Sequence, residues 1–242
     1  MLKNSRLAAL VVVLILLGQV HAGRIIGGKE ALAHSRPYMV LLERQTLSDK
    51  EFCGGFLLNE DFVMTAGHCQ AKTYNALLGL HYMHQNKEQQ KISVQREFLH
   101  EDFDRNTLSN DLMLLKLSSK AKFTKNVKPI DLADQDEGSL PQQCSVAGWG
   151  KTDWNSNLLS TKLMEVNVTL IKNENCAQNH FYCSEGMTGP FQGDSGGPLV
   201  CEDGKAYGLV SHLTINQNYI PDYRFTKIPD YIDWIMSTMK KN

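Results

Sequence analysis

The sequence predicts an all-β fold made of many short strands, as in β-barrels and β-sandwiches. Short apolar stretches rich in β-branched and aromatic residues recur along the chain, and turn-forming Gly, Asn and Asp residues separate them. A helical pattern is convincing only near the C-terminus, and no solenoid-type repeat is visible. The 242 residues suffice for one large β domain or two small ones.

The expected elements follow one another along the chain. Pro229 offers a helix start, and apolar side chains then recur at helical spacing, which predicts a helix over about residues 229–240. The stretch 126–143 contains two prolines, a glycine and several acids, and it is the best linker candidate. The predicted strands are 38–42, 56–58 running into 62–64, 92–94, 112–117, 145–147, 162–170, 198–200 and 206–211.

Composition and charge exclude several classes of protein. The chain has 25 basic and 26 acidic residues, and 42% of its residues are hydrophobic. These values are ordinary for a globular protein, so disordered, collagen-like and low-complexity chains are excluded. The formal net charge of −1 gives no electrostatic reason to expect nucleic acid as a partner.

Residues 1–22 are predicted to form a signal peptide. Lys3 and Arg6 precede an apolar run over 7–17, which is shorter than the roughly 20 residues of a membrane-spanning helix. Small residues stand where a signal peptidase reads, so cleavage is expected after Ala22. No later segment could span a bilayer, so we expect export and no membrane partner. Without residues 1–24, which hold three basic groups and no acidic ones, the net charge becomes −4.

Export changes the interpretation of the six cysteines. An even number of cysteines in an oxidising compartment predicts three disulfides, although roughly 15 connectivities are open from spacing alone. Zinc is the alternative use, but no CxxC pair exists, and the adjacent His68 and Cys69 could not easily share one tetrahedral ion. We therefore expect no metal site. Asn167 begins the single N-glycosylation sequon and is an expected glycosylation site.

A serine among glycines is the first candidate for chemistry. In the stretch 193–198, glycines permit positive φ and let a substrate carbonyl approach the backbone closely. An oxyanion hole needs such accessible amides, here those of Gly193 and Ser195. Taken alone, the motif could equally be a glycine-rich turn with an incidental serine.

Two further residues could activate this serine. A serine nucleophile needs a general base, and His68 directly follows a predicted apolar strand. Asp111 opens another apolar strand, where a carboxylate would be desolvated and must be paired. An imidazole N–H is a suitable partner, so Asp111 is preferred over Asp102 and Asp104 in their polar stretch. The remaining histidines are interpreted as surface or core residues.

These motifs together resemble the chymotrypsin-like serine protease family, over residues 25–242. The order His68, Asp111, Ser195 is that of this family and differs from the order in subtilisins and α/β-hydrolases. Within the family, the chain looks closest to granzymes and mast-cell proteases, since Phe191 stands where most members have a cysteine. The resemblance is also carried by Ile25-Ile26-Gly27-Gly28, 65–69, 109–115, Ala147-Gly148-Trp149-Gly150 and Thr226-Lys227-Ile228.

The resemblance implies two antiparallel six-stranded Greek-key β-barrels, at about residues 25–125 and 144–228, followed by the C-terminal helix. The first barrel would supply His68 and Asp111, and the second would supply Ser195 and the oxyanion hole. No cofactor is implied. The implied disulfides are Cys53–Cys69, Cys144–Cys201 and Cys176–Cys183.

Activation by cleavage is also implied. Residues 23–24 would form an activation dipeptide, and the bond between Arg24 and Ile25 would be cut. The new ammonium of Ile25 would pair with Asp194. Because a buried carboxylate without a partner is costly, cleavage would switch the loop that carries the oxyanion-hole amides.

The implied specificity pocket departs from the trypsin-like pattern. Gly189 stands where trypsin-like members place an aspartate, so a preference for Lys or Arg is not expected. Leu213, in Ser211-His212-Leu213, replaces a glycine and should narrow the pocket mouth. An inward-pointing Tyr223 would make the pocket shallow and apolar, which favours small or medium apolar side chains. A register slip by one residue would instead admit Arg224, which favours acidic side chains.

The sequence thus predicts a secreted or granule-stored serine endopeptidase, made as a zymogen and acting on proteins or peptides. An activating protease and serpin-type inhibitors are further candidate partners. One alternative is a catalytically impaired homologue that acts as a binding or carrier protein; another is a digestive or plasma enzyme. Five lysines could bind a sulfated proteoglycan, but a solvated face is the favoured interpretation. They are Lys116, Lys120, Lys122, Lys125 and Lys128.

Overall fold

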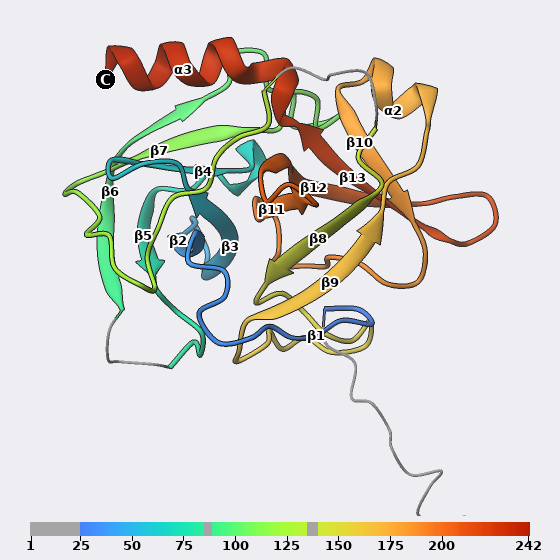
Figure 1. Ribbon diagram of the computed structural model, residues 1–242, viewed down its shortest axis with the longest axis horizontal. Helices are drawn as coiled ribbons and strands as arrows, with labels where there is room; N and C mark the ends of the chain where they lie inside the picture. Colours follow the sequence, from blue (N-terminus) through green and yellow to red (C-terminus); the bar gives the residue numbers. More distant parts are fainter. Residues whose placement is uncertain (1–24, 85–88, 135–139) are drawn as a thin grey trace, which may run out of the picture.

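The computed structural model describes residues 25–84, 89–134 and 140–242, which form two units of β structure side by side (Figure 1). The first unit is a closed barrel of antiparallel strands in the order β2-β3-β4-β7-β6-β5. The second is a seven-stranded antiparallel sheet in the order β1-β9-β8-β11-β12-β13-β10. The predicted all-β class with a C-terminal helix is therefore confirmed.

The barrel is closed around rows of apolar side chains. Phe56 lies opposite Met64 in one strand pair, and Met64 lies opposite Leu114 in the next. Directly opposite residues share a face of the sheet, and all three side chains are fully buried, so they fill the barrel interior. The strands are β2 (Met39–Gln45), β3 (Lys50–Leu57), β4 (Phe62–Thr65), β5 (Thr73–Leu78), β6 (Gln90–Leu99) and β7 (Met113–Leu117).

The second sheet has one strand more than the six that the resemblance implies. The additional strand is β1 (Lys29–Glu30), which pairs with β9 at the edge of the sheet. An isolated bridge between Ile171 and Cys183 brings the chain after β9 against β10 at the opposite edge. The other strands are β8 (Gln143–Gly148), β9 (Met164–Thr169), β10 (Phe181–Glu185), β11 (Pro198–Cys201), β12 (Ala206–Ile215) and β13 (Pro221–Lys227).

The C-terminal helix connects the second unit to the first. A 3₁₀ turn, η2 (Ile228–Tyr231), precedes α3 (Ile232–Lys241), so the predicted helix begins with a 3₁₀ turn that includes Pro229. Ile235 is fully buried in the barrel's apolar cluster. The Trp234 indole N–H donates a hydrogen bond of 2.8 Å to Glu101, which lies between β6 and β7. Within the described residues, no helix is long and apolar enough to cross a membrane.

Three disulfides link elements within each unit, in the pairing that the resemblance implies. Cys53–Cys69 joins β3 to the 3₁₀ turn η1 (Gly67–Cys69). Cys144–Cys201 links the adjacent strands β8 and β11. Cys176–Cys183 ties the short helix α2 (Glu174–Gln178), which the sequence analysis did not predict, to β10.

Candidate active site

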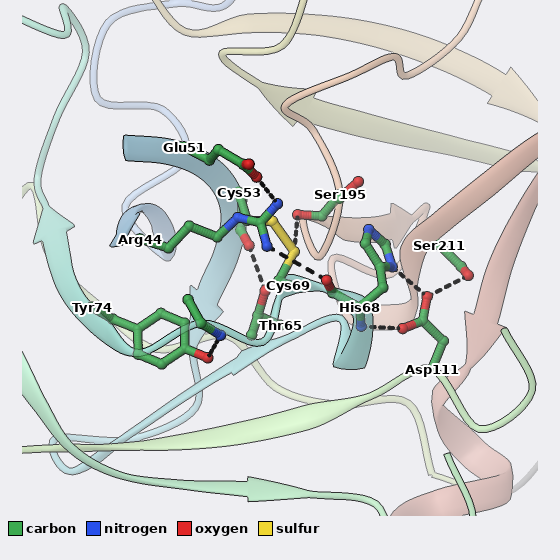
Figure 2. Close-up of a disulfide and its surroundings, with 12 residues drawn as sticks. Arg44, Glu51, Cys53, Thr65, His68, Cys69, Tyr74, Asp111, Ser195 and Ser211 are labelled. Atoms are coloured by element: carbon green, nitrogen blue, oxygen red, sulfur yellow. Dashed lines mark hydrogen bonds and ion pairs between the residues drawn. A yellow bond between two sulfur atoms is a disulfide. The ribbon is translucent and has the colours of Figure 1, made fainter. Parts of the chain in front are cut away.

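His68 is held rigidly in η1, immediately after barrel strand β4 (Figure 2). The next residue, Cys69, is fully buried and bonded to Cys53 in β3. Gly67, just before His68, is tightly enclosed, since a Cβ atom there would lie 3.0 Å from Leu99 and 3.3 Å from an Asp111 carboxylate oxygen. The backbone therefore approaches Asp111 closely, and the imidazole is left partly exposed.

Asp111 is fully buried and receives three hydrogen bonds on its carboxylate. Oδ2 accepts from His68 Nδ1 at 2.8 Å and from the Ser211 hydroxyl at 2.6 Å, while Oδ1 accepts from the His68 backbone N–H at 2.8 Å. These donors compensate the loss of water around the charge. Asp102, by contrast, has an exposed side chain, and Asp104 Oδ1 accepts from a backbone N–H of its own loop.

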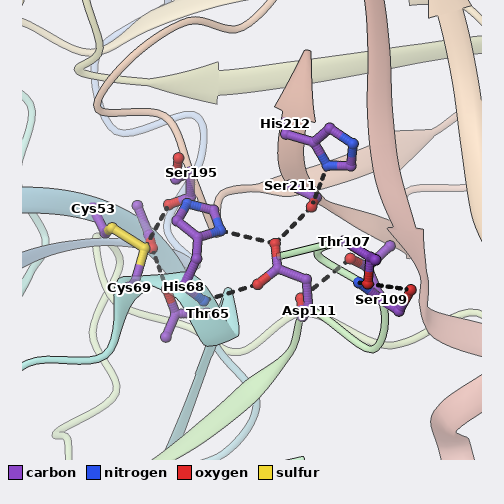
Figure 3. A network of polar contacts seen from close by, with 12 residues as sticks. Cys53, Thr65, His68, Cys69, Thr107, Ser109, Asp111, Ser195, Ser211 and His212 are labelled. Atoms are coloured by element: carbon purple, nitrogen blue, oxygen red, sulfur yellow. Dashed lines mark hydrogen bonds and ion pairs between the residues drawn. A yellow bond between two sulfur atoms is a disulfide. The ribbon is translucent and has the colours of Figure 1, made fainter. Parts of the chain in front are cut away.

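Ser195 lies on the other side of the imidazole from Asp111, as Figures 2 and 3 show. Its backbone is fixed to the barrel, because its carbonyl accepts a 2.8 Å hydrogen bond from the Gly54 N–H of β3. The neighbouring Gly196 N–H donates to Val210 O of β12 at 2.7 Å. The serine is therefore positioned by both units, and the imidazole lies between its side chain and the buried carboxylate.

Gly193 and Asp194 shape the loop that leads into Ser195. Gly193 has a φ of 101°, and a Cβ atom there would lie 2.7 Å from Leu159, so only glycine is accommodated without strain. Asp194 is fully buried, and its carboxylate accepts from the backbone N–H groups of Gly150 at 2.7 Å and Phe191 at 2.9 Å. Burial raises the pKa of Asp194 to about 7, and those two hydrogen bonds oppose the shift.

Ile25, the proposed new N-terminus, is the first residue that the structure describes. Ile25 is fully buried in the apolar cluster of the second sheet. Ile26 forms an isolated bridge with Gly189, whose N–H donates to its carbonyl at 3.0 Å. Arg24 and the predicted signal peptide lie outside the described residues. The segment 25–26 is thus seated against the loop that precedes Ser195.

A pocket of about 250 Å³ opens beside Ser195, and Tyr223 is one of its lining residues. The ring lies directly against Gly189, where a Cβ atom would be 2.5–2.7 Å from three ring atoms. Its hydroxyl is buried and has no hydrogen-bond partner among the described residues, and burial raises the pKa of Tyr223 to about 12. The other lining residues are Pro190, Phe191, Gln192, Ser195, Val210, Ser211, His212 and Leu213.

Strand register decides between the two pocket arrangements considered from the sequence. Tyr223 lies opposite Leu213 in the β12–β13 pair, and its side chain, not that of Arg224, lines the pocket. The Arg224 guanidinium lies 3.5 Å from an Asp222 carboxylate oxygen. The arrangement with an inward-pointing tyrosine is therefore the one present.

Two contacts of the site were missed from the sequence. Ser211 was expected only in the pocket, yet its hydroxyl bonds to Asp111, and the Thr226 hydroxyl donates to the Asp111 carbonyl at 3.1 Å. Both residues belong to the second sheet and lie more than 90 positions after Asp111 in the sequence. A local sequence pattern carries no signal for such a pairing. Only the resemblance to a family could have suggested it.

The sequence profile of the family described as Trypsin matches residues 25–235. The chain belongs to the trypsin family of serine proteases. Among its relatives, duodenase-1 of Bos taurus is 43% identical, with 91% of each chain covered. Granzyme B of Homo sapiens is 40% identical, with 96% of this chain and 98% of the relative covered. Cathepsin G of Homo sapiens is 36% identical, with 90% and 89% covered.

Membership of the trypsin family agrees with the fold. A solved structure of granzyme C, described as "Structure of GrC", superposes with a TM-score of 0.80 and 37% sequence identity. The match covers 89% of this chain and all of the other. The protein is thus a serine endopeptidase of the trypsin family, similar to granzymes and cathepsin G.

Proposed function

We propose that Ser195, His68 and Asp111 form the catalytic triad of this protease. The Ser195 hydroxyl attacks the carbonyl carbon of the scissile peptide bond while His68 Nε2 accepts its proton. His68 then passes that proton to the leaving amine, and an acyl-enzyme remains on Ser195. Water, deprotonated by His68, releases the acyl group. The supporting observation is the buried Asp111 carboxylate, which bonds to His68 at two points, opposite Ser195.

The backbone amides of Gly193 and Ser195 are proposed to stabilise the oxyanion. The negative charge that develops on the carbonyl oxygen is stabilised most by donors that are already in place. Gly193 at φ 101° is the residue type that such a loop needs, and Asp194 fixes the loop through two backbone amides. Neither step needs a metal ion or an organic cofactor.

The enzyme is proposed to be made as a zymogen with a signal peptide over 1–22 and an activation dipeptide at 23–24. An activating protease would cut after Arg24 and create an ammonium group on Ile25. Asp194 is the proposed counter-ion, since its buried carboxylate has backbone amides as its two hydrogen-bond donors and neither carries a charge. Pairing with the new cation would hold the oxyanion loop in place.

Substrates are proposed to be proteins or peptides with a small or medium apolar side chain before the scissile bond. The Tyr223 ring lines the pocket and lies against Gly189, and none of the described residues that line the pocket carries a carboxylate. Leu213 is proposed to narrow the entrance of the pocket further. Its place among the lining residues supports this role. A basic side chain would find no counter-charge there, and a large aromatic one would contact the Tyr223 ring.

Release into the secretory pathway or storage in granules is proposed, with serpin-type inhibitors as partners. Asn167 supports glycosylation in that pathway, because its side chain is exposed on β9. A sulfated proteoglycan is a weaker candidate partner. Lys120 pairs with Glu60 and Asp61, which reduces the charge of the lysine run, while Lys122 and Lys128 are exposed.

A fluorophosphonate probe tests the proposed nucleophile. After cleavage at Arg24, the probe is expected to label the protein on Ser195 and to block peptide hydrolysis. The Ser195→Ala variant removes the nucleophilic oxygen and is expected to lose both labelling and hydrolysis. Labelling that persists in Ser195→Ala, or a folded and cleaved protein that never labels, would contradict the proposal.

A further inference from the structure

The geometry points to His212 as a positioning residue that acts on Asp111 through the hydroxyl of Ser211. This inference rests on the proposed triad and extends it by one further histidine. His212 Nδ1 lies 2.9 Å from Ser211 Oγ, and Ser211 Oγ lies 2.6 Å from Asp111 Oδ2 (Figure 3). A continuous line of polar contacts therefore runs from His212 to His68.

A bulge in β12 explains how two consecutive side chains come into contact. Neighbouring residues of a regular strand point to opposite faces. In the β12–β13 pair, Val210 faces Phe225 and His212 faces Arg224, so the register shifts at Ser211. Such a bulge changes the direction of side chains locally. The Ser211 hydroxyl and the His212 ring are thereby brought within hydrogen-bonding distance.

Hydrogen counting gives this line of contacts a direction. The ionised carboxylate of Asp111 can only accept, so Ser211 must donate its single hydroxyl proton to it. Ser211 can then only accept from His212, which requires the proton of the His212 ring to be on Nδ1. The hydrogen bond from His212 thus polarises the Ser211 hydroxyl, which then forms a stronger hydrogen bond to the negatively charged Asp111 carboxylate.

The surroundings favour the neutral form of His212. Burial, and to a smaller extent the Arg224 guanidinium, lower the pKa of His212. The charged or titratable groups that face it are Arg224 and Asp222 from β13, with Asp111 and His68 from the barrel. The ring also makes an edge-on contact with Phe181 of β10, with centroids 5.4 Å apart. A neutral ring with its proton on Nδ1 satisfies the direction of donation derived above.

Two substitutions separate hydrogen bonding from packing. His212→Phe keeps an aromatic ring against Phe181 but has no donor for Ser211. His212→Asn loses the ring, but its amide can place a donor near the position of Nδ1.

Without a donor to Ser211, the Ser211 hydroxyl forms a weaker hydrogen bond to Asp111. More of the negative charge of Asp111 is then available to stabilise the protonated form of His68. The acid limb of the pH profile of kcat/KM is therefore expected to move up by about 0.2–0.5 pH unit in His212→Phe. It is expected to return towards the parent value in His212→Asn.

The decisive comparison is the effect of His212→Phe in a protein that already carries Ser211→Ala. If His212 acts through Ser211, then adding His212→Phe to Ser211→Ala moves the acid limb no further. An equal additional movement in that background would overturn the inference. So would an acid limb in His212→Phe that matches the parent while KM alone changes, because that result describes a residue that only shapes the cleft.

Proton NMR of the purified protein tests the same inference without turnover. The His212 ring is expected to carry its proton on Nδ1 at neutral pH, and the His68 Nδ1 proton resonance is expected to move downfield in His212→Phe. If the cleaved parent protein gave these NMR results but hydrolysed no peptide, the proposed triad would be refuted and the coupling would not. A His212 proton found only on Nε2, or an unmoved His68 resonance, would refute the coupling.

Discussion

Asp111 is a charged side chain without solvent exposure, and its three hydrogen bonds determine what it can do. Two of them come from His68, one from the ring and one from the backbone, so the carboxylate fixes both the tautomer and the orientation of the imidazole. The third comes from Ser211. An amide in place of the carboxylate cannot accept all three, because one of its two polar atoms is a donor.

The variant Asp111→Asn is expected to lower kcat by about 10⁴-fold, the effect known for this substitution in the trypsin family. The amide NH₂ would face His68 Nδ1 and favour the tautomer whose Nε2 carries the proton, so Ser195 would lose its base. Steady-state kinetics on a peptide substrate measures the loss. Asp102→Asn is the matched control, since that side chain is exposed, and it should retain the parent rate. Comparable losses in the two variants would count against the triad.

Tyr223 controls the pocket by its volume. Tyr223→Gly removes the ring that lies on Gly189, so large aromatic side chains should be accepted before the scissile bond. We expect kcat/KM for phenylalanine relative to alanine at that position to rise by at least about 10-fold. Profiling with a peptide library measures the ratio. Tyr223→Phe keeps the ring and should keep the parent preference. An unchanged preference in Tyr223→Gly would place the specificity determinant elsewhere.

At the scale of elements, strands with continuous apolar runs were predictable from the sequence. Strand β7 was expected over 112–117 and spans Met113–Leu117, and it is buried almost throughout. The C-terminal helix was predictable because its apolar face repeats at helical spacing and a proline marks its start. Strand β5 (Thr73–Leu78) was missed, since its polar first half hides the apolar residues that follow.

The remaining elements depend on partners that are distant in the sequence. The helix α2 has five residues, too few for a recognisable period, and its N-cap Asn173 and the Cys176–Cys183 disulfide hold it. Similarly, the bulge at Ser211 exists only through pairing of β12 with β13. His68, Asp111 and Ser195 could be selected from the sequence by their chemical neighbourhoods. The contact of Ser211 with Asp111 could not be selected in that way.

The disulfides should differ in their contribution to stability according to the loops that they close. Cys144–Cys201 spans 57 positions and Cys176–Cys183 spans seven. By loop-closure entropy, losing the first should cost about 4 kcal/mol of unfolding free energy and losing the second about 2–3 kcal/mol. Urea denaturation of the two double-alanine variants measures both. A larger loss from the short loop would show that Cys176–Cys183 also supports β10 and the pocket wall.

At the scale of the molecule, the site exists because the two β units meet. The barrel contributes the 3₁₀ turn with His68, and Asp111 lies two residues before β7. The second unit contributes Ser195 from the loop before β11, Ser211 from β12 and, from β13, the Thr226 hydroxyl that bonds to the Asp111 carbonyl. A backbone hydrogen bond from Gly54 to Ser195 joins the units beside the serine. Relative displacement of the units would therefore separate His68, the proposed base, from Ser195, the proposed nucleophile.

In the uncleaved chain, before the proposed activation, the buried carboxyl of Asp194 is expected to make stability depend on pH. Its pKa is raised from 3.8 to about 7 in the folded chain, so the folded state holds a proton that the unfolded state releases above pH 4. The stability of an uncleaved Arg24→Gln precursor should therefore fall as pH rises from about 4 to about 7, by a total on the order of 4 kcal/mol. Below pH 4 the carboxyl is protonated in both states, and this contribution to the pH dependence disappears.

Thermal unfolding across this pH range tests the coupling in three proteins. The Arg24→Gln precursor should lose melting temperature between pH 4 and pH 7 relative to the cleaved protein, in which the Ile25 ammonium compensates the charge. Arg24→Gln combined with Asp194→Asn has no carboxylate to ionise, so it should lack that part of the fall. If the melting temperatures of the single and double variants fell equally with pH, ionisation of Asp194 would not be the cause of the fall. The fall would then have to come from another buried group, and cleavage would need a different explanation for its effect on the oxyanion loop.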